Sequence, residues 1–185
     1  MRLWKHSKGR HDGLLLHSVT TRIIERIAEK MTLFDPTRRE FYDKEISWIT
    51  EDVALSSCLC AMNEAFILDE GIGTIIGIGE MQVKSVPEGV EHVKFPSIID
   101  RTDDFSTSDI KAFLKAIKKA TDDGKVLVHC LAGISRSPGL VSLHLCVNEG
   151  MEWEDAKRLV MEKRNIVDIH PLIERRLKEF LREQK

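Results

Sequence analysis

A cysteine and an arginine six positions apart carry the clearest chemical signal in this sequence. Cys130 ends an apolar run, Gly133 lies in the short segment after it, and Arg136 and Pro138 begin a helical pattern. Backbone N–H groups in a tight loop can form an anion-binding concavity, to which the next helix adds its positive N-terminal end. A guanidinium can bind two oxygens of one phosphate. The spacing therefore predicts a phosphate-binding loop that contains a cysteine.

The same positive field would act on the sulfur. A free cysteine has a pKa near 8.5, and helix N-termini or nearby cations lower that pKa by about 1 to 5 units. We therefore expect Cys130 to be a thiolate at neutral pH and to attack a phosphorus atom held above it. The alternative is a buried strand-end cysteine beside a surface arginine. The order of strand, His-Cys, glycine, Arg-Ser, proline and helix favours the nucleophile.

Alternating strands and helices must position this loop. Strands are expected at 47–55, 74–78, 90–95 and 126–128, and helices at 59–69, 106–121, 137–149, 153–164 and 171–182. This order predicts an α/β fold with a mainly parallel sheet. The carboxyl end of a strand is where open α/β sheets place ligands, and Cys130 follows such a strand.

Composition limits the class of protein. The chain has 185 residues, of which 42% are hydrophobic and 31% charged, as in folded globular domains. A net charge of −2 argues against a dedicated nucleic-acid binder. The sequence has no long apolar run and no signal-peptide core, so we expect no membrane span and a cytoplasmic location, with a nuclear one left open.

Residues 129–137 read His-Cys-Leu-Ala-Gly-Ile-Ser-Arg-Ser. This segment resembles the phosphate-binding loop of the cysteine-dependent protein phosphatases, and above all the dual-specificity branch, where His-Cys-x-Ala-Gly-x-Ser-Arg-Ser is the usual form. The resemblance covers about 46–182. It implies a central sheet of about five strands flanked by helices, a cysteinyl-phosphate intermediate, and no metal or other cofactor.

The resemblance also implies roles for individual residues. Arg136 would bind the phosphoryl oxygens through its guanidinium, and Ser137 would assist departure of the thiolate. His129 would order the loop, with a merely packed histidine as the alternative. The backbone amides expected to bind phosphate are those of Leu131, Ala132, Gly133, Ile134, Ser135 and Arg136.

The chemistry needs an acid as well, because a protonated leaving group departs far more easily. The family places an aspartate about thirty residues before the cysteine, and Asp100 lies thirty residues before Cys130. Asp103 and Asp104 share the same expected loop and remain alternatives for the acid.

These features predict hydrolysis of phosphotyrosine, phosphoserine and phosphothreonine on proteins, which would be the partners of the chain. A non-catalytic module that binds phosphoproteins is one alternative. A phosphoinositide, an RNA 5′-phosphate or a glucan phosphate is another kind of substrate. Leu131 and Ile134 are apolar where phosphoinositide phosphatases of this superfamily often carry lysines, which favours proteins.

The N-terminal part differs in charge from the rest. Residues 1–44 carry a net charge of +4, whereas the remaining 141 residues carry −6. A helical pattern at 19–31 ends before Asp35-Pro36. We expect an N-terminal extension with one helix at 1–44 and a catalytic domain at 45–185.

Three further cysteines need no chemical role. Cys58 and Cys60 lack a second Cys/His pair at zinc-finger spacing, and Cys146 lies in an apolar run, so we expect no metal site. The sequence leaves open whether one of the three takes part in redox regulation of Cys130.

Overall fold

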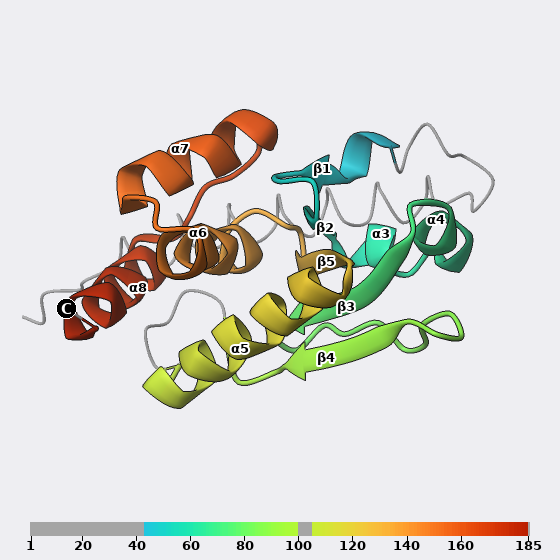
Figure 1. Cartoon of the computed structure of the whole chain (residues 1–185), viewed down its shortest axis with the longest axis horizontal. Helices are drawn as coiled ribbons and strands as arrows, with labels where there is room; N and C mark the ends of the chain where they lie inside the picture. The colour runs from blue at the N-terminus through green and yellow to red at the C-terminus, as the bar shows by residue number, and fades with distance from the viewer. Residues whose placement is uncertain (1–42, 100–104, 185) are drawn as a thin grey trace, which may run out of the picture. The chain divides into compact units, whose positions relative to one another are not determined.

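Five strands form one sheet in the part of the chain that the computed structural model describes, residues 43–99 and 105–184 (Figure 1). The strands are β1 (Ser47–Trp48), β2 (Val53–Ser57), β3 (Ile72–Ile78), β4 (Glu91–Phe95) and β5 (Lys125–Cys130). Their spatial order is β1-β2-β5-β3-β4. Only β1 is antiparallel to its neighbour. The expected α/β fold with a mainly parallel sheet of about five strands is confirmed.

Strand β5 lies in the middle of the sheet, between β2 and β3. Its residues Val126, Leu127 and Val128 are fully buried, as expected for a strand covered on both faces. Ser57 at the end of β2 pairs with Cys130, and Gly77 near the end of β3 pairs with His129. The carboxyl ends of these three parallel strands therefore meet at one edge of the sheet.

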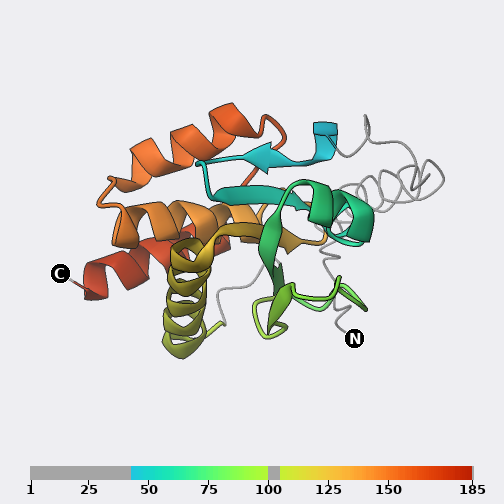
Figure 2. The same cartoon turned by 45° about the vertical axis from the view of Figure 1, so that its right-hand side comes forward.

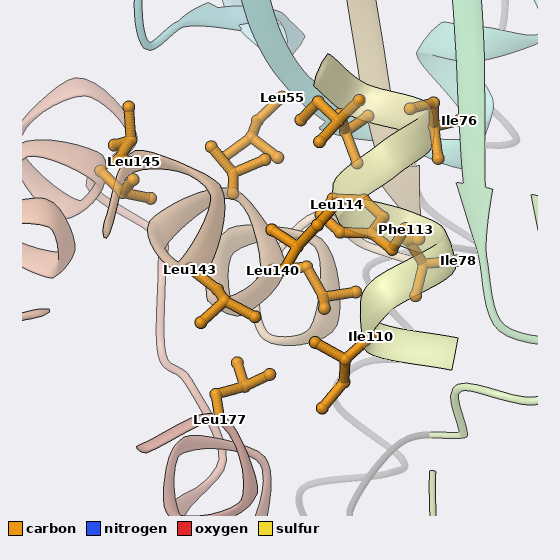
Figure 3. Packing of buried hydrophobic residues seen from close by; sticks show 14 of the residues in the cluster. Leu55, Ile76, Ile78, Ile110, Phe113, Leu114, Leu140, Leu143, Leu145 and Leu177 are labelled. Carbon is orange, nitrogen blue, oxygen red and sulfur yellow. The ribbon is translucent and has the colours of Figure 1, made fainter. Parts of the chain in front are cut away.

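Helices cover both faces of the sheet (Figure 2). The four long helices are α5 (Thr107–Asp123), α6 (Arg136–Asn148), α7 (Trp153–Lys163) and α8 (Pro171–Glu183), and α6 contacts the other three. Their buried side chains share one core with one face of β2, β3 and β5, as Leu55, Ile76 and Leu140 illustrate (Figure 3). The short helices α3 (Cys58–Ala61) and α4 (Glu64–Asp69) contribute Ala61 and Ile67 to the second core, on the opposite face.

Two sequence-based expectations near the start of the domain were wrong. The single strand expected at 47–55 is instead a short hairpin, because Thr50 Oγ1 accepts a hydrogen bond from Val53 N (3.0 Å) and turns the chain. The single helix expected at 59–69 is two helices. Asn63 separates them, since its side chain accepts a hydrogen bond from Phe66 N (2.9 Å) and begins α4.

The other expected elements match the structure within a few residues at each end. Among the described residues, no helix combines the length and the apolar character needed to cross a membrane. The extension and helix predicted at 1–44 lie, apart from the last two residues, outside the described residues and stay predictions.

Candidate active site

The predicted order of strand, loop and helix surrounds Cys130. Cys130 is the last residue of β5, and Arg136 is the first residue of α6. Ser135 occupies the N-cap position, but its side chain makes no capping hydrogen bond to α6. Its Oγ instead accepts a hydrogen bond from the backbone N of His170 (3.0 Å). Because α6 begins directly after the loop, the partial positive charge at the N-terminus of this helix acts on the loop.

The backbone carbonyls of residues 131–134 are all tied to neighbouring segments of the chain. The bonds run from Cys58 N to Leu131 O (3.1 Å), from Arg164 Nη2 to Ala132 O (3.4 Å), from Arg164 Nε to Gly133 O (2.8 Å) and from Asp168 N to Ile134 O (2.9 Å). In a trans peptide, the C=O of one residue and the N–H of the next point in opposite directions. The N–H groups of residues 132–135 therefore point away from these partners, as a cradle for an anion requires.

Gly133 is required at the centre of this loop. Its φ is +66°, a conformation that favours glycine. A Cβ at this position would also lie 2.4 Å from the carbonyl oxygen of Ser56 and 2.8 Å from Nη2 of Arg164. Any side chain here would strain the backbone and displace the loop from its supports.

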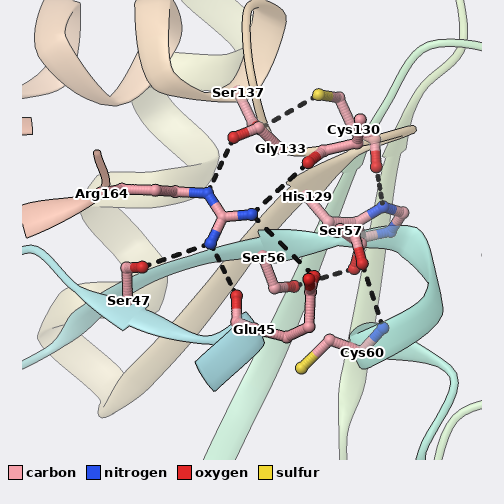
Figure 4. Close-up of polar contacts among 11 residues, drawn as sticks. Glu45, Ser47, Ser56, Ser57, Cys60, His129, Cys130, Gly133, Ser137 and Arg164 are labelled. Atoms are coloured by element: carbon pink, nitrogen blue, oxygen red, sulfur yellow. Dashed lines mark hydrogen bonds and ion pairs between the residues drawn. The ribbon is translucent and has the colours of Figure 1, made fainter. Parts of the chain in front are cut away.

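Cys130 is almost entirely buried, and Ser137 Oγ donates a hydrogen bond to its sulfur (3.3 Å; Figure 4). Burial by itself raises the pKa of Cys130. The charge of Arg136 and hydrogen bonds from Ser137 and from the backbone of Gly133 outweigh burial, so the pKa lies below that of an ordinary cysteine. The site therefore favours the thiolate.

Arg136 is buried, with 7% of its surface exposed. Its guanidinium lies against Gly79, just beyond β3: a Cβ at Gly79 would be 1.8 Å from Nη1 of Arg136. The same Cβ would be 3.3 Å from the carbonyl oxygen of Ile98. The absence of a side chain at Gly79 thus leaves room for the guanidinium of Arg136.

His129 is fully buried, and its Nδ1 lies 3.2 Å from the carbonyl oxygen of Cys130. Burial is the main reason that the pKa of His129 falls to about 4, and the nearby charges of His92 and Arg136 lower it further. The ring is therefore neutral at pH 7, and its Nδ1–H tautomer would donate to the Cys130 carbonyl. This arrangement fits the loop-ordering role that the resemblance implies.

The other three cysteines are free thiols. Burial is the main reason that the pKa of Cys58 and of Cys146 rises to about 11. Cys60 is fully buried within the small core cluster that also contains Phe66. These environments agree with the packing roles expected for all three residues.

The opposite pKa shifts predict selective alkylation. Because only a thiolate reacts, iodoacetate at pH 7 should modify Cys130 at least about tenfold faster than Cys58 or Cys146. The difference should narrow as the pH rises toward 11, where the two other thiols ionise. Peptide mapping by mass spectrometry at successive times measures each rate. Equal rates at pH 7 would show that the site does not stabilise the Cys130 thiolate.

Asp100, Asp103 and Asp104 lie outside the described residues, so the acid stays a prediction. The residues on both sides of that segment are described, and the side chain of Asp109 connects the two sides. Its Oδ1 accepts a hydrogen bond from Ser97 Oγ (2.9 Å), and its Oδ2 accepts one from Ser106 N (3.1 Å). The two ends of the segment that carries the acid candidates are therefore held together.

Arg164 belongs to the site but was not among the residues expected from the sequence. It is 4% exposed and follows α7 directly. Besides its bonds to the loop, Nη1 donates to Glu45 O (2.6 Å) and to Ser47 Oγ (3.2 Å), and the Glu45 carboxylate lies 4.0 Å from Nη2 (Figure 4). No local spacing connects residue 164 with residue 133, so only the folded chain brings them together.

Comparison with known proteins identifies the class of this domain. The family model described as "Dual specificity phosphatase, catalytic domain" matches residues 53–183. The chain belongs to the dual-specificity phosphatase family, which confirms the resemblance seen around Cys130.

Individual relatives share part of the chain. Dual specificity protein phosphatase 22 of Mus musculus is 34% identical over 94 residues, which are 50% of this chain and 50% of that protein. Protein-tyrosine-phosphatase IBR5 of Arabidopsis thaliana is 37% identical over 59 residues, 32% of this chain and 23% of that protein. The chain thus spans half or less of these two relatives. The crystal structure of human DUSP28 shares the fold, with a TM-score of 0.66 and 19% identity over 76% of this chain and 95% of that one.

Proposed function

We propose that residues 45–185 hydrolyse phosphotyrosine, phosphoserine and phosphothreonine on proteins through a cysteinyl-phosphate intermediate. The observation that carries this proposal is the loop between β5 and α6. Its backbone carbonyls accept hydrogen bonds from neighbouring segments of the chain, and its amides point away from those segments. The pKa of the adjacent Cys130 is lowered. A site with these features can bind a phosphoryl group and attack it.

In the first step, the Cys130 sulfur attacks phosphorus, and the bond between phosphorus and the leaving oxygen breaks. Asp100 gives its proton to that oxygen, so the product leaves as an alcohol or phenol. Arg136 and the loop amides stabilise the charge on the three equatorial oxygens, which is the main catalytic task in phosphoryl transfer.

In the second step, water attacks phosphorus and passes a proton to the Asp100 carboxylate. The sulfur–phosphorus bond breaks, and Cys130 leaves as a thiolate. Ser137 is placed to stabilise that leaving thiolate, since its hydroxyl donates to the sulfur at 3.3 Å. Inorganic phosphate is released, Cys130 is again a thiolate, and Asp100 is again protonated.

Protein substrates are favoured over the alternatives by the side chains of the loop. Leu131 and Ile134 are apolar and partly exposed, so they add no positive charge for a multiply phosphorylated inositol ring. The presence of both Cys130 and Arg136 argues against a module that only binds phosphoproteins.

A substrate panel tests the proposal. Peptides that carry phosphotyrosine, phosphoserine or phosphothreonine, phosphoinositide vesicles, RNA with a 5′-triphosphate and phosphorylated glucan are each incubated with the full chain. Released phosphate is measured, with Cys130→Ser as the blank. We expect the highest kcat/KM on phosphopeptides. Turnover of the lipid, RNA or glucan alone would overturn the substrate class, and phosphopeptide binding without turnover would indicate a binding module.

A further inference from the structure

The four hydrogen bonds to the carbonyls of residues 131–134 come from two kinds of donor. The donors to Leu131 O and Ile134 O are backbone amides, which no substitution other than proline removes. The donors to Ala132 O and Gly133 O belong to a single side chain, Arg164. Among these bonds, Arg164 therefore supplies the part of the support that mutation can remove.

The guanidinium of Arg164 is itself fixed from several directions. Nη1 binds Glu45 O and Ser47 Oγ, and the negative charge of the Glu45 carboxylate lies 4.0 Å from Nη2. All three nitrogens of the guanidinium are thus hydrogen-bonded, which a single ammonium group cannot reproduce. Both Arg164 and Glu45 are buried, so neither is free to take up another geometry without leaving the other charge poorly compensated.

We propose that Arg164 is a positioning residue that holds the loop of residues 131–136 in its anion-binding conformation, and that Glu45 and Ser47 hold Arg164 in place. This inference rests on the proposed function. Arg164 binds the loop on the side opposite to the amides, so it acts on bound phosphate through those amides. It links the chain just before β1 to the catalytic loop.

Two consequences follow from this arrangement. If the Ala132 and Gly133 carbonyls lose their partner, the N–H groups of the next residues lose their fixed direction, and the transition-state charge is stabilised less well. The Cys130 thiolate also loses amide dipoles, so its apparent pKa rises. Small displacements of a preorganised site can cost about 10²-fold in rate.

The test compares Arg164→Met and Arg164→Lys with Arg158→Met. Arg158 lies on α7, which ends just before Arg164; it is 65% exposed and pairs with Asp155 at the surface, so it provides a matched control. For each full-chain variant we measure kcat and KM for p-nitrophenyl phosphate against pH, inhibition by tungstate, and the unfolding temperature. We expect Arg164→Met to lower kcat/KM about 10²-fold and to weaken tungstate inhibition about tenfold. The acid limb of the profile of kcat/KM against pH should move to higher pH. Arg164→Lys should recover less than a tenth of the lost activity, and Arg158→Met should behave as wild type.

A folded Arg164→Met variant with wild-type tungstate inhibition and an unmoved acid limb would overturn the inference. If Arg164→Met does not fold, Glu45→Gln provides a milder variant, since it keeps the backbone bond to Nη1 and removes only the charge. It should weaken tungstate binding in the same direction, and unchanged tungstate binding in Glu45→Gln and Arg164→Lys would overturn the inference. Calorimetric tungstate binding keeps the two proposals separate. A wild-type chain that binds tungstate without turning over any ester would contradict the proposed function, while the affinities of the variants would still decide the role of Arg164.

Discussion

The Cys130→Ser variant loses turnover of p-nitrophenyl phosphate by at least about 10⁴-fold, the scale seen when a covalent nucleophile is removed. The reason is the ionisation of the attacking group. The pKa of Cys130 is lowered by Arg136, Ser137 and the Gly133 backbone, whereas a serine hydroxyl in the same place stays protonated at neutral pH. Initial rates across pH 5–9 measure the effect.

Cys146→Ser is the matched control for this substitution. Cys146 is half-buried on α6, and the pKa of its thiol is raised to about 11, so the same sulfur-to-oxygen change should leave kcat within about twofold. The Cys130→Ser variant should still bind tungstate, because the loop amides and Arg136 remain. Phosphate release by Cys130→Ser at a rate near that of wild type would exclude Cys130 as the nucleophile.

The Asp100→Asn variant should slow hydrolysis of phenyl phosphate by about 10²–10⁴-fold, the usual contribution of a positioned general acid. An amide cannot donate the proton that a poor leaving group needs. The loss should be much smaller for esters whose leaving group is already a weak base, such as a fluorinated umbelliferone. Wild-type activity should fall at high pH as the acid loses its proton, and this basic limb should disappear in the variant.

Asp103→Asn and Asp104→Asn serve as controls, because both residues share the segment with Asp100. Each should keep the basic limb and most of the activity. If Asp100→Asn has the wild-type rate on phenyl phosphate and one of the other two variants does not, the acid role moves to that residue.

The features that the sequence predicted well are those encoded by neighbouring residues. An apolar run, a glycine that must adopt a positive φ and a proline in the first helical turn define β5, the loop and α6 around Cys130 without reference to the rest of the chain. The parallel sheet follows from the alternation of strands and helices. The location of Cys130 beside Arg136 and Ser137 is a consequence of that local order.

Features that depend on distant parts of the chain could not be predicted in this way. Arg164 meets Gly133 only because α7 packs on α6 and returns its end to the loop. Gly79 has no local signature as the neighbour of the Arg136 guanidinium. The hairpin at β1 was missed because Thr50, Glu51 and Asp52, which turn the chain, are polar residues that also fit an exposed stretch of strand.

Direct detection of the intermediate tests the central claim. The full chain is mixed with p-nitrophenyl phosphate, quenched in acid within milliseconds, digested and analysed by mass spectrometry. We expect one phosphoryl group on the peptide that contains Cys130, formed during the burst of p-nitrophenol and lost as substrate is consumed. An unmodified Cys130 peptide during steady turnover, or a phosphoryl group on another residue, would show that hydrolysis does not pass through a phosphorylated Cys130.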